Sequence, residues 1–366
     1  MSAPAIPAGV AEIDAAWLDG AMKAGGILED NSVSAIVTAD IGAGVGLMGA
    51  LLRLRIEYIN RDDRLPRSVV VKLPSAAPEN FAIGKAMFLY AREWGFYKHL
   101  AADAPVRSPR LYYGAFDEDS HRFVLVLEDL GGLVMPDQIE GASAEQARLA
   151  VREIARLHGA FWGKVDAGPL ASFFDLAGAE YADAVQMGYA AYLPPTLANF
   201  GTLFQPATRD LAERYAGKLA AHLSGVGSQH RTFVHGDFRL DNMFFGQPGE
   251  ERFAAIDWQI SGRGAGLYDV AYFLSGSVST DVRRAVEEDA LAEYCEIVGA
   301  LGATDFDLAE CRAQYRNALL ACLIVPVYVC GALDLANARG RQLAEICLRR
   351  ALAAVEDHDA GAFLPD

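Results

Sequence analysis

The sequence predicts an α+β protein of two lobes, a small β-rich N-terminal lobe with one helix and a larger, mostly helical C-terminal lobe. Three observations carry this prediction. The 366 residues are enough for two domains of ordinary size. Apolar residues alternate with polar ones in short runs before residue 127, and they recur at helical spacing in most of the remainder. Strands followed by helices are typical of α+β folds, and they argue against a doubly wound sheet.

The N-terminal part, residues 1–127, is predicted to be rich in strands. A first helix ends at Gly25-Gly26, and a second helical period extends over residues 80–100. Short alternating or β-branched runs bounded by turn residues indicate strands. The expected strands are residues 34–41, 51–59, 68–73, 111–116 and 123–127.

The C-terminal part, residues 128–366, is predicted to be mainly helical. Residues 142–162 form a strong helical pattern, and strand-like pieces return only at 232–258, where they flank a polar loop. A helix over 180–200 is expected to break at Pro194-Pro195. The apolar run 318–333 is interrupted by Pro326 and falls short of a membrane span, so we expect a buried helix there.

Composition excludes several classes of partner. Thirty-two Lys and Arg against 48 Asp and Glu give a net charge of −16, whereas nucleic acids and anionic membranes are bound by basic surfaces. The five cysteines include no C-x-x-C pair, which favours reduced core thiols. The N-terminus has no apolar run typical of a signal peptide. We therefore expect a cytoplasmic protein, a monomer or a homodimer, that binds neither nucleic acid nor membrane.

A glycine-rich segment lies between two predicted strands. Gly44, Gly46 and Gly49 match the pattern G-x-G-x-x-G, and the residues after them alternate as a strand does. In a dinucleotide-binding fingerprint, a helix rather than a strand would begin at these glycines. The context therefore favours a hairpin loop whose backbone N–H groups cover nucleotide phosphates. The alternative is a flexible hairpin turn.

Lys72 follows three consecutive valines in a predicted strand. A buried ammonium needs partners, which a phosphate and a carboxylate would supply. Glu93 lies at the border of the buried face of the next helix, and Glu79 is the competing candidate. Alternatively, Lys72 extends to water at the strand end and Glu93 is an ordinary solvated helix charge.

The most specific motif is the polar loop between the later strands. An H-G-D triplet starts at His235; Asn242 follows Asp237 by five positions, and Asp257 follows it by twenty. A carboxylate such as Asp237 accepts the proton of a hydroxyl nucleophile. Asn242 and Asp257 offer the oxygen ligands that Mg²⁺ prefers, and Arg239 is placed to meet a phosphate. The alternative is a polar turn between two core strands.

With these motifs the chain resembles the kinase-like small-molecule phosphotransferases, which include aminoglycoside phosphotransferases, choline kinases and ecdysteroid-kinase-like proteins. The resemblance extends over nearly the whole chain and implies a protein-kinase-like fold, with a nucleotide-binding lobe (1–127) and a catalytic, substrate-binding lobe (128–366). The further matching motifs are VLEDL at 126–130, ARLHGAFW at 155–162, VHGDFRLDNMFF at 234–245, IDWQ at 256–259 and GLYDVAYFL at 266–274.

The resemblance also implies a role for each matching residue. Asp237 is expected to be the catalytic base or the residue that orients the hydroxyl, with Arg239 beside it, and Asn242 and Asp257 are expected to bind the metal. His235 and Asp269 are expected to brace the catalytic loop. The residues expected to hold the nucleotide are Gly44, Gly46, Gly49, Lys72 tethered by Glu93, and the backbone of Glu128 and Leu130.

The predicted activity is ATP- and Mg²⁺-dependent transfer of the γ-phosphate to a hydroxyl group of a small molecule. The segment 180–200 is a candidate substrate wall whose acidic residues are Glu180 and Asp183, which favours a fairly apolar alcohol over an aminoglycoside. A nucleotide-binding pseudokinase is the alternative of another class, and four intact residues argue against it: Lys72, Asp237, Asn242 and Asp257. Transfer of AMP is a third alternative. The replacement of Phe-Gly by Trp258-Gln259 and the lack of an A-P-E segment argue against a protein substrate.

Overall fold

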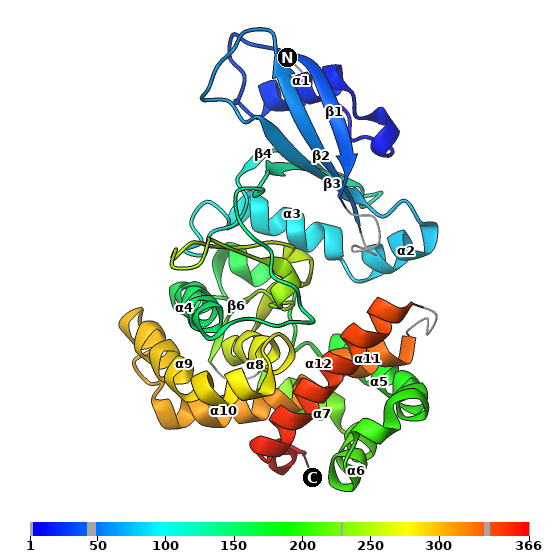
Figure 1. Cartoon of the computed structure of the whole chain (residues 1–366), viewed down its shortest axis with the longest axis vertical. Coiled ribbons are helices and arrows are strands. Elements are labelled where there is room, and N and C mark those ends of the chain that lie inside the picture. Colours follow the sequence, from blue (N-terminus) through cyan, green and yellow to red (C-terminus); the bar gives the residue numbers. More distant parts are fainter. Residues whose placement is uncertain (1–2, 42–48, 228–229, 333–336, 366) are drawn as a thin grey trace. The chain divides into compact units, whose positions relative to one another are not determined.

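The computed structural model describes residues 3–41, 49–227, 230–332 and 337–365, and its internal contacts divide the chain into two compact units (Figure 1). Unit 1 contains Met1–Asp103, Ser108–Leu133 and Ile256–Ile260. Unit 2 contains Ala104–Arg107, Val134–Ala255 and Ser261–Asp366. The units differ from the predicted lobes chiefly because residues 128–133 and 256–260 belong to unit 1. The second of these segments contains Asp257.

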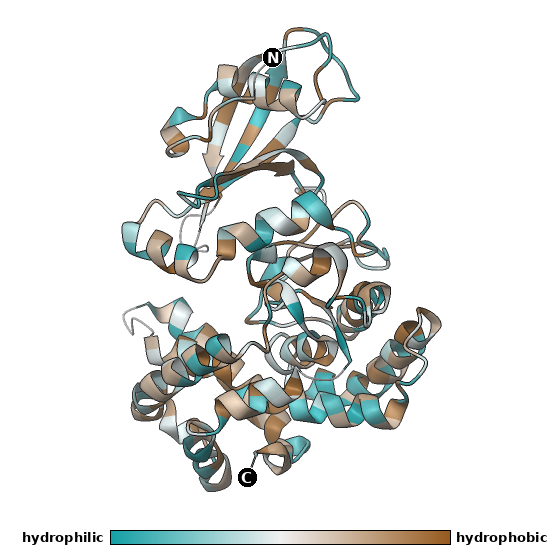
Figure 2. Cartoon of the chain, turned by 180° about the vertical axis from the view of Figure 1, so that it is seen from behind, coloured by the Kyte–Doolittle hydropathy of each residue, from teal (hydrophilic) through white to brown (hydrophobic). Residues whose placement is uncertain are grey.

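Unit 1 is built on an antiparallel sheet, five-stranded within the described residues, with the order β1-β2-β3-β5-β4. Each predicted strand is present, and its ends agree with the prediction to within two residues. Alternation along β2 buries Leu52 and Leu54 on one face, and Figure 2 shows the matching alternation of hydropathy along the strands. The strands are β1 (Val33–Asp40), β2 (Gly49–Tyr58), β3 (Ser68–Pro74), β4 (Leu111–Phe116) and β5 (Phe123–Glu128).

One face of this sheet is covered by the helix α1 (Ala15–Ala24) (Figure 1). Leu18 and Met22, four residues apart on α1, are buried against Leu54 and Val71 of the sheet. The Asp14 side chain begins the helix by accepting a hydrogen bond from the Trp17 amide at 2.7 Å. Because the apolar face of β2 and β3 is filled in this way, Lys72, which alternates with Val71, projects from the opposite face.

The described part of unit 1 has three helices rather than the one predicted for this lobe: besides α1, the second helical period forms two helices instead of one. These are α2 (Pro78–Ala86) and α3 (Leu89–His99), and the chain turns between them at Phe88, whose φ of 58° is left-handed. The prediction of one helix is wrong at this point because the turn uses no Gly or Pro to mark it. The turn leaves Glu93 on the buried face of α3 and Glu79 exposed on α2.

Unit 2 is mainly helical, as predicted. Its first long helix, α4, begins at a capping box in which the Ser143 hydroxyl and the Gln146 side chain each bond the other's backbone N–H. Figure 1 shows α8 among the other helices of this unit. The helices are α4 (Ala144–Phe161), α5 (Ala179–Phe200), α6 (Pro206–Tyr215), α7 (Leu219–Val226), α8 (Gly266–Gly276), α9 (Thr280–Ala300), α10 (Leu308–Ala321), α11 (Ile324–Ala332) and α12 (Ala338–Asp357). Short 3-10 turns are Val10–Glu12 and Trp258–Ile260 in unit 1, and Gly168–Ser172, Gly201–Leu203, Leu240–Asn242 and Ala360–Phe363 in unit 2.

Short strands of unit 2 hold the polar loop between them. The strand β6 (Arg231–Val234) enters the loop and pairs with β9 (Gly262–Ala265), while β7 (Met243–Phe245) leaves it and pairs with β8 (Phe253–Ala255). The strand-like pieces predicted at 232–258 are therefore present. The glycine-rich β9 was not predicted, because glycine is depleted in strands.

Prolines at two places in unit 2 have different effects on the helices that contain them. The predicted break at Pro194-Pro195 is wrong: α5 continues through both prolines, packed along α11. Pro326 lies in the first turn of α11, where a missing N–H costs nothing, and α10 ends just before. The joint segment Leu308–Ala332 is long and apolar enough to cross a membrane, but 56% of its most apolar window is buried. Buried core helices pass the same test, so this is weak support for a membrane span.

Candidate active site

In unit 1 the Lys72 ammonium is held between two carboxylates. Its Nζ lies 2.8 Å from Oε1 of Glu93 and 2.9 Å from Oδ1 of Asp257. Lys72 and Glu93 are buried, whereas Asp257 keeps about a third of its side chain exposed, at 34%. The structure thus selects Glu93 over Glu79 as the partner of Lys72.

Charge and burial act in opposite directions on this group. Burial alone would lower the pKa of Lys72, but the charges of Asp257 and Glu93 outweigh it and raise that pKa. Burial raises the pKa of Glu93, and the Lys72 ammonium acts against that shift. The lysine is consequently a fixed cation, and Asp257 is the more accessible of its two partners.

Asp257 and Glu93 are held by an aromatic stack as well as by Lys72. Trp258, fully buried, stacks on Phe96 with ring centroids 3.7 Å apart and an interplanar angle of 8°. Phe96 follows Glu93 by three residues on α3, so both lie on one face of that helix. Asp257 itself has a left-handed φ of 63°, which costs roughly 1 kcal/mol for a residue other than glycine. The stack and the ion pair offset this strain.

The remaining nucleotide-binding candidates of unit 1 are backbone groups. A Cβ on Gly49 would lie 3.1 Å from the Leu73 carbonyl and 3.5 Å from Cε of Lys72, so glycine permits the close approach there. The Glu128 amide donates to the Arg110 carbonyl, whereas no hydrogen bond among the described residues uses the N–H of Leu130. That donor is available to a ligand. Gly44 and Gly46 lie outside the described residues.

In unit 2 the polar loop surrounds the carboxylate of Asp237 with donors. Tyr272 of α8 donates to Oδ1 at 3.2 Å, while the Asn242 amide at 2.9 Å and Nε of Arg239 at 3.2 Å donate to Oδ2. The Asn242 amide also donates to the Asp237 carbonyl, which closes the loop on itself. These contacts orient the carboxylate, and the five-residue spacing from Asp237 to Asn242 is what allows them.

Arg239 is shared between two acidic groups of the loop. It contacts Asp237 through Nε and Asp241 through Nη1. Burial alone would lower the pKa of Arg239, but the charge of Asp237 outweighs it and raises that pKa. The guanidinium therefore stays charged beside Asp237 at every accessible pH.

A buried polar network fixes the start of the loop. Asp269 accepts the backbone N–H groups of His235 at 2.7 Å and Gly236 at 2.9 Å. Its Oδ2 also lies 3.2 Å from Nε2 of His158, whose Nδ1 lies 3.0 Å from the hydroxyl of Tyr294. The φ of Gly236 is +80°, so glycine suits this position. Asp269 and His158 are fully buried and brace the loop from behind.

Sequence reasoning missed several residues of this site. Tyr272 and Asp241 were not singled out, and the contact between the buried His158 and Asp269 was not predicted. The helical spacing from Asp269 to Tyr272 was the one available signal, because residues three apart share a helix face. Elsewhere in unit 2, His222 is buried between Tyr215 and Asn317.

In unit 2 the Asn242 side chain keeps an oxygen that is suited to bind a cation. The nitrogen of the Asn242 amide is used by Asp237, and no hydrogen bond among the described residues uses its oxygen. No cluster of three or more His, Cys, Asp or Glu side chains that could hold a metal occurs in the described part of the chain. A cation at Asn242 or at Asp257 would therefore need further oxygen ligands, such as those of phosphates, to complete its shell, as Mg²⁺ commonly does.

Comparison with known proteins identifies the family. Residues 43–300 match the model of the ecdysteroid kinase-like family. A stretch of 60 residues is 45% identical to mouse (Mus musculus) acyl-CoA dehydrogenase family member 10; it is 16% of this chain and 5% of that protein. The chain thus spans a small fraction of this curated relative.

Solved structures agree on the fold. A microcompartment-associated aminopropanol kinase is 17% identical with a TM-score of 0.53, over 90% of this chain and 94% of its own. A GDP complex of a mutant aminoglycoside 2'-phosphotransferase-IIIa is 14% identical with a TM-score of 0.53, over 91% and 93%. An ethanolamine kinase of Plasmodium vivax is 11% identical with a TM-score of 0.50, over 88% and 81%. At these identities the likeness shows the fold alone, a two-lobed kinase-like fold, as predicted.

The family match covers more than half of the chain and includes the polar loop, Lys72 and Asp257. The predicted resemblance is thereby confirmed, and the chain belongs to the ecdysteroid kinase-like family of kinase-like small-molecule phosphotransferases.

Proposed function

We propose that this protein transfers the γ-phosphate of ATP, with Mg²⁺, to a hydroxyl group of a small molecule. The observation that carries the proposal is the buried Lys72 ammonium between Glu93 and Asp257, because a lysine fixed in this way can hold nucleotide phosphates. The free N–H of Leu130, with the Glu128 carbonyl, would bind the edge of the adenine ring. Gly44, Gly46 and Gly49 would cover the phosphates.

Asp237 would accept the proton of the attacking hydroxyl and hold that oxygen in line with the phosphate. Its three donors, from Tyr272, Arg239 and Asn242, fix the direction in which it points. Arg239 would neutralise charge that develops on the transferred group. Asn242 and Asp257 would hold Mg²⁺, which supplies charge neutralisation at the phosphates.

The acceptor is proposed to be a fairly apolar alcohol. The acidic residues of α5, Glu180 and Asp183, are exposed, and the rest of the helix offers Tyr181, Tyr192 and small apolar side chains. An aminoglycoside, with several ammonium groups, would require more carboxylates, and it is the second candidate. A nucleotide-binding pseudokinase is the alternative of another class.

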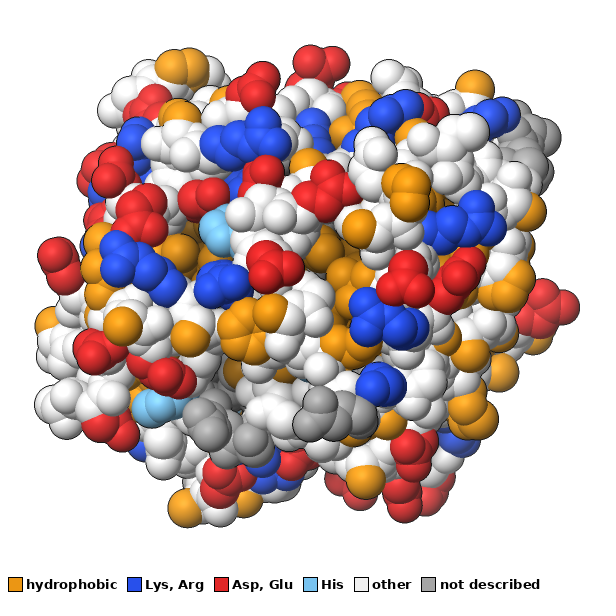
Figure 3. Space-filling model, turned by 90° about the horizontal axis from the view of Figure 1, so that it is seen from below, with side chains coloured by type: hydrophobic (Ala, Val, Ile, Leu, Met, Phe, Trp, Pro, Cys, Tyr) orange, Lys and Arg blue, Asp and Glu red, His pale blue; other side chains and the backbone are white. Residues whose placement is uncertain are grey.

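We also propose a cytoplasmic protein, monomeric or homodimeric, with no nucleic-acid partner. The net charge of −16 supports the absence of a nucleic-acid partner. On the face seen in Figure 3, acidic and basic side chains are interspersed, so the view displays no continuous basic surface.

Thermal unfolding tests the nucleotide site directly. Mg·ATP is expected to raise the melting temperature, and ATP with EDTA to raise it less, since a ligand bound only by the folded state stabilises it. Asp257→Ala is expected to abolish the metal-dependent part of the shift. A panel of alcohols with a non-hydrolysable ATP analogue then searches for the acceptor. No response to any nucleotide would refute both the kinase and the pseudokinase proposals.

A further inference from the structure

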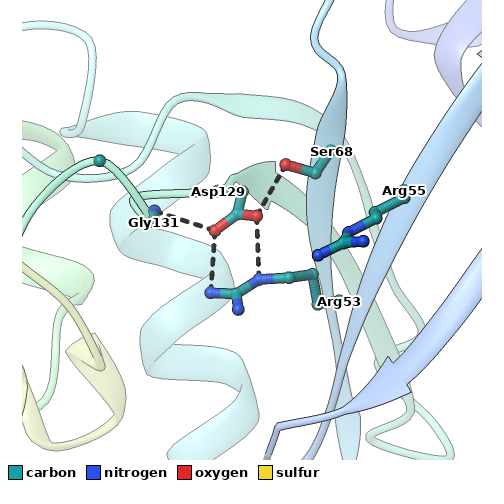
Figure 4. Close-up of a pocket in the computed structure, with 6 residues that line it drawn as sticks. Arg53, Arg55, Ser68, Asp129 and Gly131 are labelled. Carbon is teal, nitrogen blue, oxygen red and sulfur yellow. Dashed lines mark hydrogen bonds and ion pairs between the residues drawn. The ribbon is translucent and has the colours of Figure 1, made fainter.

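The segment that follows β5 is fastened to the sheet of unit 1 by one carboxylate (Figure 4). The Asp129 carboxylate contacts both Nε of Arg53, at 2.9 Å, and Nη2 of Arg53, at 3.1 Å. It also accepts the Ser68 hydroxyl at 2.7 Å and the Gly131 amide at 3.0 Å. The paired guanidinium contact is the geometry in which arginine holds a carboxylate most firmly. We call Arg53, Ser68 and Asp129 the hinge clamp.

The clamp joins elements that are distant in sequence. Arg53 lies on β2, Ser68 begins β3, and Asp129 is the first residue after β5. Asp129 also lies between Glu128 and Leu130, whose backbone groups are the proposed contacts of the purine base. A side chain that fixes Asp129 to two strands therefore fixes the peptide groups on either side of it.

The same segment contains two buried leucines, Leu130 and Leu133, with two glycines between them. The clamp lines a cavity of about 290 Å³ with Arg55, Gly131 and Gly132, so every lining residue is polar or glycine. Gly131 and Gly132 have no side chains to pack, and glycine leaves the backbone free to adopt many conformations. The Asp129 carboxylate, with 8% of its side chain exposed, therefore adds a polar fastening to the packing of these leucines.

The clamp lies on the sheet face that carries Lys72. In the β2–β3 register Arg53 is opposite Val70 and Leu51 is opposite Lys72, and residues two apart on a strand share a face. The fastening is thereby on the side where the phosphates are proposed to bind. Resting on the proposed function, we infer that the hinge clamp positions the purine-binding backbone and so determines nucleotide affinity and the preference between adenine and guanine.

The preference follows from base chemistry. The edge of adenine presents a donor amine beside an acceptor nitrogen, whereas guanine presents an acceptor oxygen beside a donor nitrogen. The two bases therefore need opposite arrangements of peptide N–H and C=O groups. A segment held in one orientation favours one base, and a released segment can turn its peptide groups to accept either.

The test compares Asp129→Asn and Arg53→Met with the control Arg55→Met. Arg55 lies on the same strand and lines the same cavity, but it is exposed and is not bonded to Asp129 in Figure 4. Binding of Mg·ATP and Mg·GTP is titrated for each variant, and folding is followed by the melting temperature without nucleotide. The clamp variants are expected to lose about tenfold in affinity for the preferred nucleotide and about fivefold in the ratio of the two affinities. The control is expected to match the wild type.

Three outcomes would overturn the inference. If both clamp variants have a lower melting temperature but bind Mg·ATP and Mg·GTP with the wild-type affinities, the clamp contributes to folding alone. If Arg55→Met has the same effect as Arg53→Met, general positive charge rather than the clamp is responsible. If the wild type binds neither nucleotide, the proposed function fails, and the inference fails with it.

Discussion

At the scale of the residue, the proposed chemistry depends on where Asp237 points. Asp237→Asn keeps the shape of the side chain but cannot accept a proton. We expect kcat to fall by about 10³-fold, the usual order for loss of a general base, while affinity for Mg·ATP stays within a few-fold. Product formation and nucleotide titration measure the two effects separately. A fully active variant would contradict the assignment of the base.

Tyr272 is the residue that the structure adds to this site. Tyr272→Phe removes the donor to Oδ1 of Asp237 but keeps the ring, which stacks on Tyr268 with an interplanar angle of 4°. We expect kcat/KM to fall by about fivefold, since one hydrogen bond to a charged group is lost.

A purely structural role for Tyr272 would give a different result. The melting temperature would fall, while the activity of the folded protein would match that of the wild type. Asn242 and Arg239 are still present in the Phe variant, so the carboxylate keeps two of its three donors.

At the scale of the element, α3 and the turn after Asp257 are joined by the ring stack of Phe96 and Trp258. Trp258→Ala is expected to lower the free energy of unfolding by about 3–5 kcal/mol, as large-to-small changes in a core do. It should also weaken Mg·ATP binding, because Asp257 and Glu93 lose their common support. Trp258→Phe keeps most of the stack and should retain most of both properties. Chemical denaturation and nucleotide titration provide the measurements.

The stack also provides a comparison within unit 1. Tyr90→Phe alters another buried ring of α3, and it removes only a hydroxyl that lies 3.4 Å from the Ser75 amide. That variant should bind Mg·ATP as the wild type does. Equal losses from Trp258→Ala and Tyr90→Phe would mean that any change in the α3 core disturbs binding, and the stack would have no special role.

The elements themselves were largely predictable, because alternation and helical spacing follow directly from burial of one face. The five strands of unit 1 and the strand-like pieces at 232–258 were predicted in this way, whereas β9 was not. The turn at Phe88 was not, since nothing in its local sequence marks a left-handed residue. The continuous α5 was also missed, because packing along α11 outweighs the local effect of Pro194 and Pro195.

The site shows the same division between local and tertiary information. The spacing of Asp237 and Asn242 is local, and it predicted a loop that the structure closes by hydrogen bonds. The bonds from His158 to Asp269 and from Arg53 to Asp129 join residues 111 and 76 positions apart, respectively. No pattern within a single element contains such pairs.

At the scale of the whole molecule, one buried histidine couples folding to pH. Nδ1 of His222 lies 2.9 Å from the Tyr215 hydroxyl, and Nε2 lies 2.7 Å from Oδ1 of Asn317. With its hydrogen on Nε2, the neutral ring satisfies both partners. Burial lowers the pKa of His222 from its ordinary value of 6.5, and the hydrogen bond to Asn317 opposes this shift.

The sign of the effect on stability follows from that lowered pKa. Above pH 6.5, His222 is neutral in both the folded and the unfolded chain, so it contributes no dependence on pH. Below pH 6.5 the unfolded chain takes up the proton first, and the free energy of unfolding falls by at most about 1.4 kcal/mol per pH unit.

His222→Gln can offer the same acceptor and donor without titrating. Denaturant titrations from about pH 5 to pH 8 give the free energy of unfolding of both proteins at each pH. Plotted against pH, the two curves should be parallel above pH 6.5, and below it the wild type should lose stability faster than the variant. Because all other titrating groups are shared, the difference isolates His222, and curves that stay parallel throughout would show that its protonation is not coupled to folding.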